Sequence, residues 1–307
     1  MPSSRRSMIR QSLLGGLGVI SLPALSAFVN QENMIQRPIP SSGEALPLVG
    51  LGTWQTFDVG AAASERSPLV EVLKILMEKG GKVIDSSPMY GKSEAVVGDL
   101  TAAMGNSAHF FYATKVWTSG KDAGTRQMQA SMEKMRRKQM DLMQIHNLVD
   151  WKTHVKTLKA WKETGKIRYW GITHYVDPAH EELEAIIRSE QPDFAQFNYS
   201  IRSRHAERSL LDSCSKHKTA VIINQPYESG SLFRLVKGKA LPSWVAEFDI
   251  NSWGQYFLKF ILSHGAVSCV IPGTSTPEHM LDNAMAGYGR LPDEAGRERM
   301  FDYLNTI

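Results

Sequence analysis

The sequence predicts an α/β protein of the (β/α)8 barrel class, preceded by an export signal. Short apolar runs alternate with amphipathic stretches along residues 31–307, and there are eight such runs. Polar residues close three consecutive runs at intervals of about one strand and one helix. Strands that alternate with helices form parallel sheets, and eight such units close into a barrel. A doubly wound open sheet is the alternative, but no GxGxxG turn follows an early strand.

Residues 1–30 have the composition of a cleavable signal peptide. A basic start precedes an apolar middle rich in Leu and Gly, and small residues at Ala24–Ala27 fit a processing site. The segment Ser4–Arg10, "SRRSMIR", resembles a twin-arginine signal through its paired Arg5 and Arg6. A single membrane helix is the alternative, but the apolar run is short and broken by glycine. We expect the twin-arginine export machinery to deliver the folded protein to the periplasm, without stable membrane insertion of the mature chain.

Residues 31–307 are expected to form one barrel domain, and the mature chain is expected to begin near residue 28. Stretches such as Pro68–Gly80 and Glu181–Glu190 carry apolar residues three and four positions apart, which indicates helices between the strands. The end of the chain, from Gly289, is expected to form one last helix instead of a long lid, which leaves an open pocket. The eight apolar runs begin at Leu46, Lys82, His109, Met140, Ile167, Asp193, Thr219 and Val267.

Composition excludes several functional classes. The formal net charge is +4, but without three arginines of the signal the balance is 32 basic against 31 acidic residues, or +1. This gives no support for a nucleic-acid partner, which would require a clustered basic face. Cys214 and Cys269 are the two cysteines, and they build neither a disulfide framework nor a Cys-based metal site. The histidines lack the close pairing of a zinc motif, so we expect no metal.

Three polar residues close consecutive apolar runs. Asp85, Lys115 and His146 are separated by 30 and 31 residues, and Tyr90 follows in the loop after the second run. The C-terminal strand ends of a (β/α)8 barrel carry its chemistry. We therefore expect these four side chains to converge on one pocket.

The four residue types together predict a proton donor. A free tyrosine has a pKa near ~10, and a buried ammonium such as that of Lys115 favours the phenolate and is expected to lower the pKa of Tyr90. Asp85 can hold that ammonium, and His146 can hydrogen-bond the oxygen that the phenol addresses. No activated Ser or Cys nucleophile accompanies them. Reduction of a carbonyl fits best, with hydride from a cofactor.

These residues resemble the catalytic tetrad of the aldo-keto reductases. "IDSSPMYGKSE" is similar to the family's signature around its Asp and Tyr, "ATKVW" carries the Lys and "QIHN" the His. The resemblance begins at the hairpin-like "MIQRPIPSSGEALPLVGLGTW" and reaches the C-terminal helices. It implies a (β/α)8 barrel with a short N-terminal β-hairpin, which binds an extended nicotinamide dinucleotide without a Rossmann domain. It also implies that Tyr90 is the general acid and that Asp85, Lys115 and His146 tune and position it.

The resemblance also implies a cofactor site. Thr173 and His174 stand where the family has Ser-Asn for the carboxamide. Gln225 stands near the position of a stacking Tyr, with Tyr227 close by in the sequence. The implied cofactor positions are Gly52, Thr53, Trp54, Thr173, His174, Gln196, Gln225, Gly273, Thr274, His279, Asp282 and Asn283.

Cofactor preference rests on the last of these segments, "IPGTSTPEHMLDN". Gly273 and His279 replace a Lys and an Arg of many NADPH-specific members. Loss of two cations weakens selection for the 2′-phosphate, which is read by charge-assisted contacts. We expect NADPH on family habit, with NADH as the alternative.

The predicted function is NAD(P)H-dependent reduction of a small aldehyde or ketone to an alcohol. Two alternatives are open from the sequence. The first is a nicotinamide-binding regulatory or sensor protein of the same fold with little turnover. The second is an isomerase or lyase that uses the same acid. The intact tetrad favours the enzyme, because a binding protein does not need Tyr90.

Overall fold

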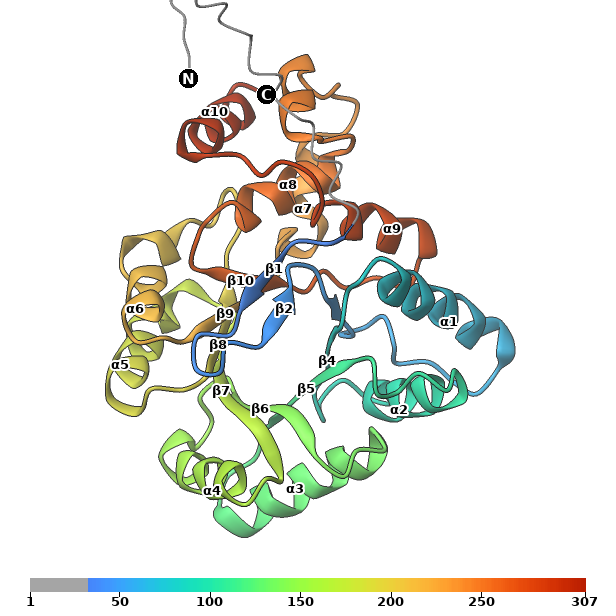
Figure 1. Cartoon of the computed structure of the whole chain (residues 1–307), viewed down its shortest axis with the longest axis vertical. Helices are drawn as coiled ribbons and strands as arrows, with labels where there is room; N and C mark the ends of the chain where they lie inside the picture. Colours follow the sequence, from blue (N-terminus) through green and yellow to red (C-terminus); the bar gives the residue numbers. More distant parts are fainter. Residues whose placement is uncertain (1–32) are drawn as a thin grey trace, which may run out of the picture. The chain divides into compact units, whose positions relative to one another are not determined.

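The computed structural model describes residues 33–307, so the predicted signal at residues 1–30 lies outside the described residues. The described residues form one compact unit. In its described part, eight parallel strands pair in chain order from β3 to β10 and lie inside a ring of helices (Figure 1). These strands are β3 (Leu51–Gly52), β4 (Val83–Asp85), β5 (Phe111–Val116), β6 (Met140–His146), β7 (Ile167–Thr173), β8 (Phe194–Asn198), β9 (Ala220–Asn224) and β10 (Val267–Val270).

The barrel closes between its first and last strands. Parallel bridges join Val49 to Val270 and Gly52 to Gly273. A Cβ atom on Gly52 would lie 2.7 Å from the Ile271 carbonyl oxygen, so a larger residue there would push the two segments apart. The predicted (β/α)8 fold is thereby confirmed.

Helices cover the outer face of the sheet. Outward side chains of the strands pack against the helices in one apolar cluster, while inward side chains such as Phe111, Leu142 and Phe194 fill the interior of the barrel in a second cluster. The α-helices are α1 (Ala63–Glu78), α2 (Ser93–Ala103), α3 (Lys121–Lys134), α4 (Trp151–Glu163), α5 (His180–Glu190), α6 (Leu210–Lys216), α7 (Ser231–Leu235), α8 (Trp253–Leu262), α9 (Pro277–Met285) and α10 (Glu294–Asn305). The 3-10 helices are η1 (Asp177–Ala179), η2 (His205–Arg208), η3 (Glu228–Gly230) and η4 (Ser243–Phe248).

An antiparallel hairpin, β1 (Gln36–Pro38) and β2 (Ala45–Pro47), precedes the barrel as predicted. Ile39 and Leu46 of the hairpin segment are buried in the same cluster as the barrel interior. Arg37 donates to the carbonyl oxygens of Leu262 at 2.7 Å and His264 at 2.8 Å. A guanidinium is favourable there because the last carbonyls of α8, such as that of Leu262, lack partners within the helix and carry the negative end of the helix dipole. The hairpin is thus fixed to the far end of the chain.

The predicted elements agree with the structure except at their edges. The first apolar run divides, so that Leu46 belongs to the hairpin and the barrel strand is only β3. Helix α1 begins at Ala63, before the expected Pro68, so that Pro68 lies inside the helix, where it has no backbone N–H to donate to the preceding turn. The last helix, α10, is confirmed. The sequence did not predict the connection between β9 and α8, which contains η3, α7 and η4.

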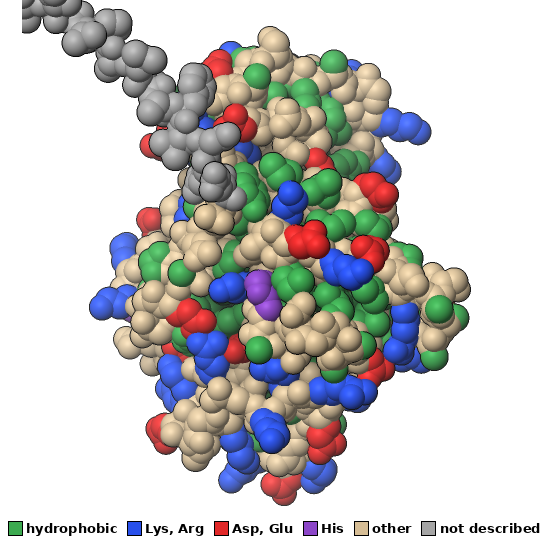
Figure 2. All heavy atoms as spheres, turned by 45° about the vertical axis from the view of Figure 1, so that its right-hand side comes forward, with side chains coloured by type: hydrophobic (Ala, Val, Ile, Leu, Met, Phe, Trp, Pro, Cys, Tyr) green, Lys and Arg blue, Asp and Glu red, His purple; other side chains and the backbone are tan. Residues whose placement is uncertain are grey.

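The surface of the described residues mixes charges of both signs. On the face shown in Figure 2, Lys and Arg side chains are interspersed with Asp and Glu. Exposed pairs such as Arg136 with Asp99, at 2.6 Å, are of this kind, and each contributes little to stability. Within residues 33–307, no helix combines the length and the apolar character needed to cross a bilayer.

Candidate active site

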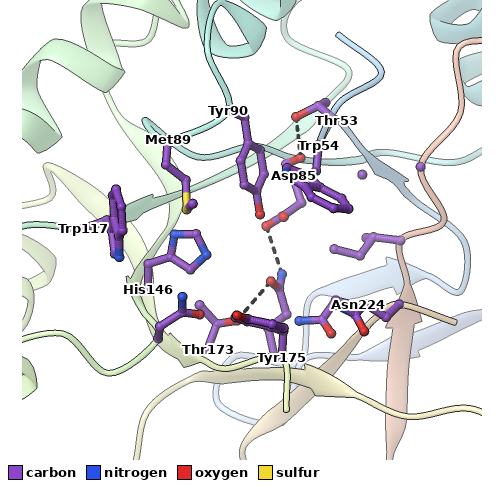
Figure 3. A pocket seen from close by; sticks show the side chains of 16 residues that line it. Thr53, Trp54, Asp85, Met89, Tyr90, Trp117, His146, Thr173, Tyr175 and Asn224 are labelled. Atoms are coloured by element: carbon purple, nitrogen blue, oxygen red, sulfur yellow. Dashed lines mark hydrogen bonds between the residues drawn. The ribbon is translucent and has the colours of Figure 1, made fainter. Parts of the chain in front are cut away.

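A cavity of about 540 Å³ opens at the C-terminal ends of the barrel strands. Asp85, Tyr90 and His146 line it, and in Figure 3 the phenol of Tyr90 points toward the Asp85 carboxylate. The predicted positions Gly52, Thr53, Trp54, Thr173, Gln196, Gln225 and Gly273 also line it.

The rim predicted from the 30-residue spacing is present. Asp85 ends β4, Lys115 lies one residue before the end of β5, and His146 ends β6. Lys115 has no exposed surface and reaches the site from within the barrel. Its Nζ donates to Asp85 Oδ2 at 2.6 Å and to the Ser86 carbonyl oxygen at 2.8 Å, and lies 5.1 Å from the centroid of the Tyr90 ring.

The charge state of Lys115 follows from these contacts. Burial opposes the charged form, but the Asp85 carboxylate and the neighbouring Tyr90 favour it, and the net effect raises the pKa of Lys115. The side chain is therefore an ammonium at neutral pH. It forms a buried ion pair with Asp85, which is 2% exposed.

The pKa of Tyr90 corrects the sequence expectation. We expected a nearby ammonium to lower it, whereas the net direction is upward. Burial of the phenol is the largest cause, and the charge of Asp85 acts in the same sense, while Lys115 opposes both. Tyr90 consequently stays protonated throughout the neutral range, which is the state that a proton donor needs.

His146 is neutral in this site. Burial, helped by the charge of Lys115, lowers its pKa to about 3. Its Nδ1 lies 3.0 Å from Ser87 Oγ, and its ring meets the Tyr90 ring edge-on with centroids 6.0 Å apart. A neutral imidazole beside the phenol can hydrogen-bond a substrate oxygen without adding a charge.

Gln196 and Thr173 form the polar floor of the cavity. Gln196 Nε2 donates to Asp85 Oδ1 at 2.9 Å, and Gln196 Oε1 accepts from Thr173 Oγ1 at 3.1 Å. His174 lies beside them but does not line the cavity. Its backbone amide donates to the Gln196 carbonyl oxygen at 3.0 Å, and its ring stacks on Tyr175 with centroids 5.5 Å apart.

The connection after β9 places Gln225 and Tyr227 differently. Gln225 lines the cavity. Tyr227 packs against Phe233 with ring centroids 4.8 Å apart, and its hydroxyl donates to Asn283 Oδ1 at 2.5 Å. Tyr227 therefore belongs to the packing between α7, α8 and α9, and it does not supply the stacking surface that its sequence position suggested.

The remaining predicted cofactor positions lie in α9 or just before it, outside this cavity. Asp282 accepts from Ser252 Oγ at 2.6 Å and from Gln255 Nε2 at 2.7 Å, so it ties α9 to the start of α8. Asn283 is held by Tyr227. Thr274 Oγ1 accepts from the backbone amide of Thr276 at 3.0 Å and shapes the turn into α9, while His279 is exposed on that helix.

Several residues of the cavity were not singled out from the sequence. Met89, Trp117 and Tyr175 are 40%, 42% and 48% exposed, and with Trp54 they make an apolar rim. Asn147 and Asn224 also line the cavity, and the Oδ1 atom of each is buried with no hydrogen-bond partner among the described residues. The available signal was their place at strand ends, since Asn147 directly follows β6 and Asn224 is the last residue of β9.

Comparison with known proteins identifies the family to which this barrel belongs. Residues 48–297 match the model of the aldo/keto reductase family, and the chain therefore belongs to this family of oxidoreductases. Methylglyoxal reductase YeaE of Escherichia coli (strain K12) is 30% identical over 259 residues, which cover 82% of this chain and 89% of that protein. An aldo-keto reductase of Mycobacterium sp. (strain KMS) is 25% identical over 79% of this chain and 84% of its own length.

Solved structures share the fold. An aldo/keto reductase from Klebsiella pneumoniae in complex with NADP and acetate superposes with a TM-score of 0.72 at 24% identity, over 85% of this chain and 93% of the other. An aldo-keto reductase from Bacillus halodurans in its holo form gives a TM-score of 0.71 at 20% identity, over 89% and 96%. These likenesses establish the barrel architecture.

Proposed function

We propose that this protein reduces the carbonyl group of a small aldehyde or ketone to an alcohol, with Tyr90 as the general acid. One observation carries the proposal: the buried ammonium of Lys115, 2.6 Å from Asp85, lies 5.1 Å from the ring of Tyr90 under an open cavity. Family membership supports it. The E. coli relative named for methylglyoxal makes short α-oxoaldehydes sensible first substrates.

Each side chain has a distinct role in the proposed carbonyl reduction. As the substrate oxygen gains negative charge, Tyr90 gives it a proton and the resulting phenolate is stabilised by Lys115. Asp85 keeps that ammonium charged and aimed. His146 hydrogen-bonds the same substrate oxygen and stays neutral because its pKa is about 3. The apolar rim excludes water and orients the carbonyl.

The residues of the cavity fit a nicotinamide dinucleotide. Such a cofactor supplies the hydride when it is bound, since no side chain can do so. The Asn224 Oδ1 atom, buried without a partner among the described residues, and the amide of Gln196 offer the hydrogen-bonding groups that a carboxamide needs. Gly52 and Gly273 bring bare backbone to the same wall, where a flat ring can approach closely.

We propose NADPH as the preferred cofactor, with Thr274, His279, Asp282 and Asn283 as the candidate positions at its adenosine end. Thr274 and the start of α9 offer a hydroxyl and backbone amides to a phosphate. Quenching of tryptophan fluorescence provides the measurement, because Trp54 and Trp117 line the cavity. We expect a lower dissociation constant for NADPH than for NADH, and a clear preference for NADH would contradict the assignment.

Turnover is the decisive test of the proposed function. We expect oxidation of NADPH at 340 nm when methylglyoxal or an aromatic aldehyde is added, with the alcohol as product. Cofactor binding without turnover of either substrate would favour the regulatory alternative instead.

We also propose that the protein acts in the periplasm after export by the twin-arginine route. The paired Arg5 and Arg6 before an apolar stretch support this. Export of a folded chain suits a protein that acquires its cofactor before it leaves the cytoplasm.

A further inference from the structure

The Asp85 carboxylate accepts hydrogen bonds from side chains on three other strands. Its Oδ2 accepts from Lys115 Nζ of β5 at 2.6 Å. Its Oδ1 accepts from two amides, Gln144 Nε2 of β6 at 3.1 Å and Gln196 Nε2 of β8 at 2.9 Å. Both oxygens are thereby fixed, and the plane of the carboxylate is set by donors on either side.

The two glutamines are not equivalent. Gln196 lines the cavity, and its Oε1 accepts from Thr173, so it also belongs to the floor that faces a ligand. Gln144 is fully buried, lies outside the cavity lining and is directly paired with Lys115 across the sheet. Its Oε1 atom is buried with no hydrogen-bond partner in the described part of the chain.

The sheet makes room for this buried amide. Gln144 is paired with Gly171 on β7, and a Cβ at Gly171 would lie 3.2 Å from Gln144 Cγ. The absence of a side chain there leaves space for the glutamine. A leucine in the interior would leave no polar atom unsatisfied, whereas the glutamine buries an orphan acceptor, which disfavours folding. Within residues 33–307, the one hydrogen bond that the side-chain amide makes is its bond to Asp85.

We propose that Gln144 is a positioning residue for the reaction: it holds the Asp85 carboxylate in a fixed orientation, so that Asp85 keeps Lys115 placed beside Tyr90. A hydrogen bond from a buried amide to a carboxylate is charge-assisted, and here it helps to fix the plane of the carboxylate. Gln144 itself touches neither the cavity nor Tyr90, and it acts through the ion pair. This inference rests on the proposed carbonyl reduction and adds a residue to it.

The test compares Gln144→Met, which keeps the volume but removes the amide, with wild type and with Met143→Leu. Met143 is the neighbouring residue on β6, is equally buried and packs in the cluster between sheet and helices, so it controls for a change in this strand. We expect kcat of Gln144→Met to fall by about tenfold or more, as befits loss of a bond to a charged group. We expect KM to stay within about twofold, because Gln144 does not line the cavity.

One further readout separates positioning from a structural role. The variant Gln144→Met removes the orphan oxygen together with one of the donors to Asp85, so its Tm should stay close to that of wild type. Met143→Leu should leave kcat unchanged.

Several outcomes overturn the proposal. Unchanged kcat would remove the role, and a raised KM at unchanged kcat would make Gln144 a ligand contact. A loss of activity that follows a loss of Tm, or failure of both Gln144→Met and Gln144→Leu to fold, would show that the amide serves the barrel itself. Failure of the proposed function is distinguishable, because wild type would then show no turnover before any variant is compared.

Discussion

Lys115 and Asp85 form an ion pair inside the barrel, with 2.6 Å between Nζ and Oδ2 and side chains that are 0% and 3% exposed. Charges so thoroughly removed from water depend on each other. Removal of either charge leaves the other buried without a partner. We therefore expect substitutions in this pair to change both the free energy of unfolding and the activity.

Lys115→Met is expected to lower the free energy of unfolding by about 3–5 kcal/mol, because it leaves the Asp85 carboxylate buried and unpaired. The double variant Lys115→Met with Asp85→Asn should recover a large part of that loss, although it restores no activity. Urea denaturation measures both. Equal or greater instability of the double variant would show that the pair does not behave as a unit.

Tyr90→Phe removes one hydroxyl and should reduce kcat by about 100- to 10,000-fold, the usual contribution of a general acid. The dissociation constant of the cofactor should not change, since the ring is retained. Steady-state kinetics and fluorescence titration give the two numbers. Turnover at the wild-type rate would show that another group delivers the proton.

His146 should not titrate in the neutral range, because its pKa in the folded protein is about 3. Its ordinary value is 6.5, so between these two pH values the unfolded chain binds the additional proton. His146 therefore removes stability as pH falls from about 6.5 towards 3, by about 3–5 kcal/mol in full. Urea midpoints of wild type and His146→Gln across this window provide the measurement, and the variant should show the shallower slope. Parallel curves would mean that His146 is protonated normally.

Lys259 is a second buried lysine, and its role is structural. Its Nζ donates to the carbonyl oxygens of Phe248 at 2.6 Å, Tyr288 at 2.7 Å and Arg290 at 3.1 Å. Lys259→Met should lower the free energy of unfolding by about 2–4 kcal/mol, because three carbonyls lose their donor. Thermal unfolding would detect it, and kcat measured well below Tm should be unaffected. A large change in kcat would connect Lys259 with the active site.

Replacement of Arg5 and Arg6 by lysine should stop export, because a twin-arginine signal depends on that pair. Cell fractionation should then find the full-length chain in the cytoplasm. For the wild-type chain, N-terminal sequencing of a periplasmic fraction should give a start near residue 28. Wild-type protein that keeps Met1 in the cytosol would refute the proposal.

The sequence predicted those parts of the site that follow from periodicity. Asp85, Lys115 and His146 recur once per strand and helix, and parallel strands necessarily bring such positions to one rim. The direction of the pKa shift at Tyr90 could not be predicted, because it depends on how deeply the phenol is buried relative to its distance from Lys115. Gln144 carried a signal that went unused: a polar residue inside an apolar run, two positions before His146 and hence on the same face.

The connection after β9 marks the limit of such reasoning. Whether Tyr227 faces a ligand or the helices is decided by its packing against Phe233 and its bond to Asn283, residues on two other elements. No local pattern contains that information. The neighbouring Gln225, whose position is set by the strand end itself, was placed in the cavity as expected.

The attachment of Arg37 to Leu262 and His264 spans 225 and 227 residues of chain. During synthesis the hairpin emerges among the first described segments, while its docking site on α8 emerges near the last. The hairpin can therefore dock only after α8 has been made, and a contact between such distant segments forms slowly. In chains truncated before residue 262, Arg37 should lack its partners on α8, so the hairpin should stay undocked. The apolar interior of the incomplete barrel should then be exposed to association with other chains.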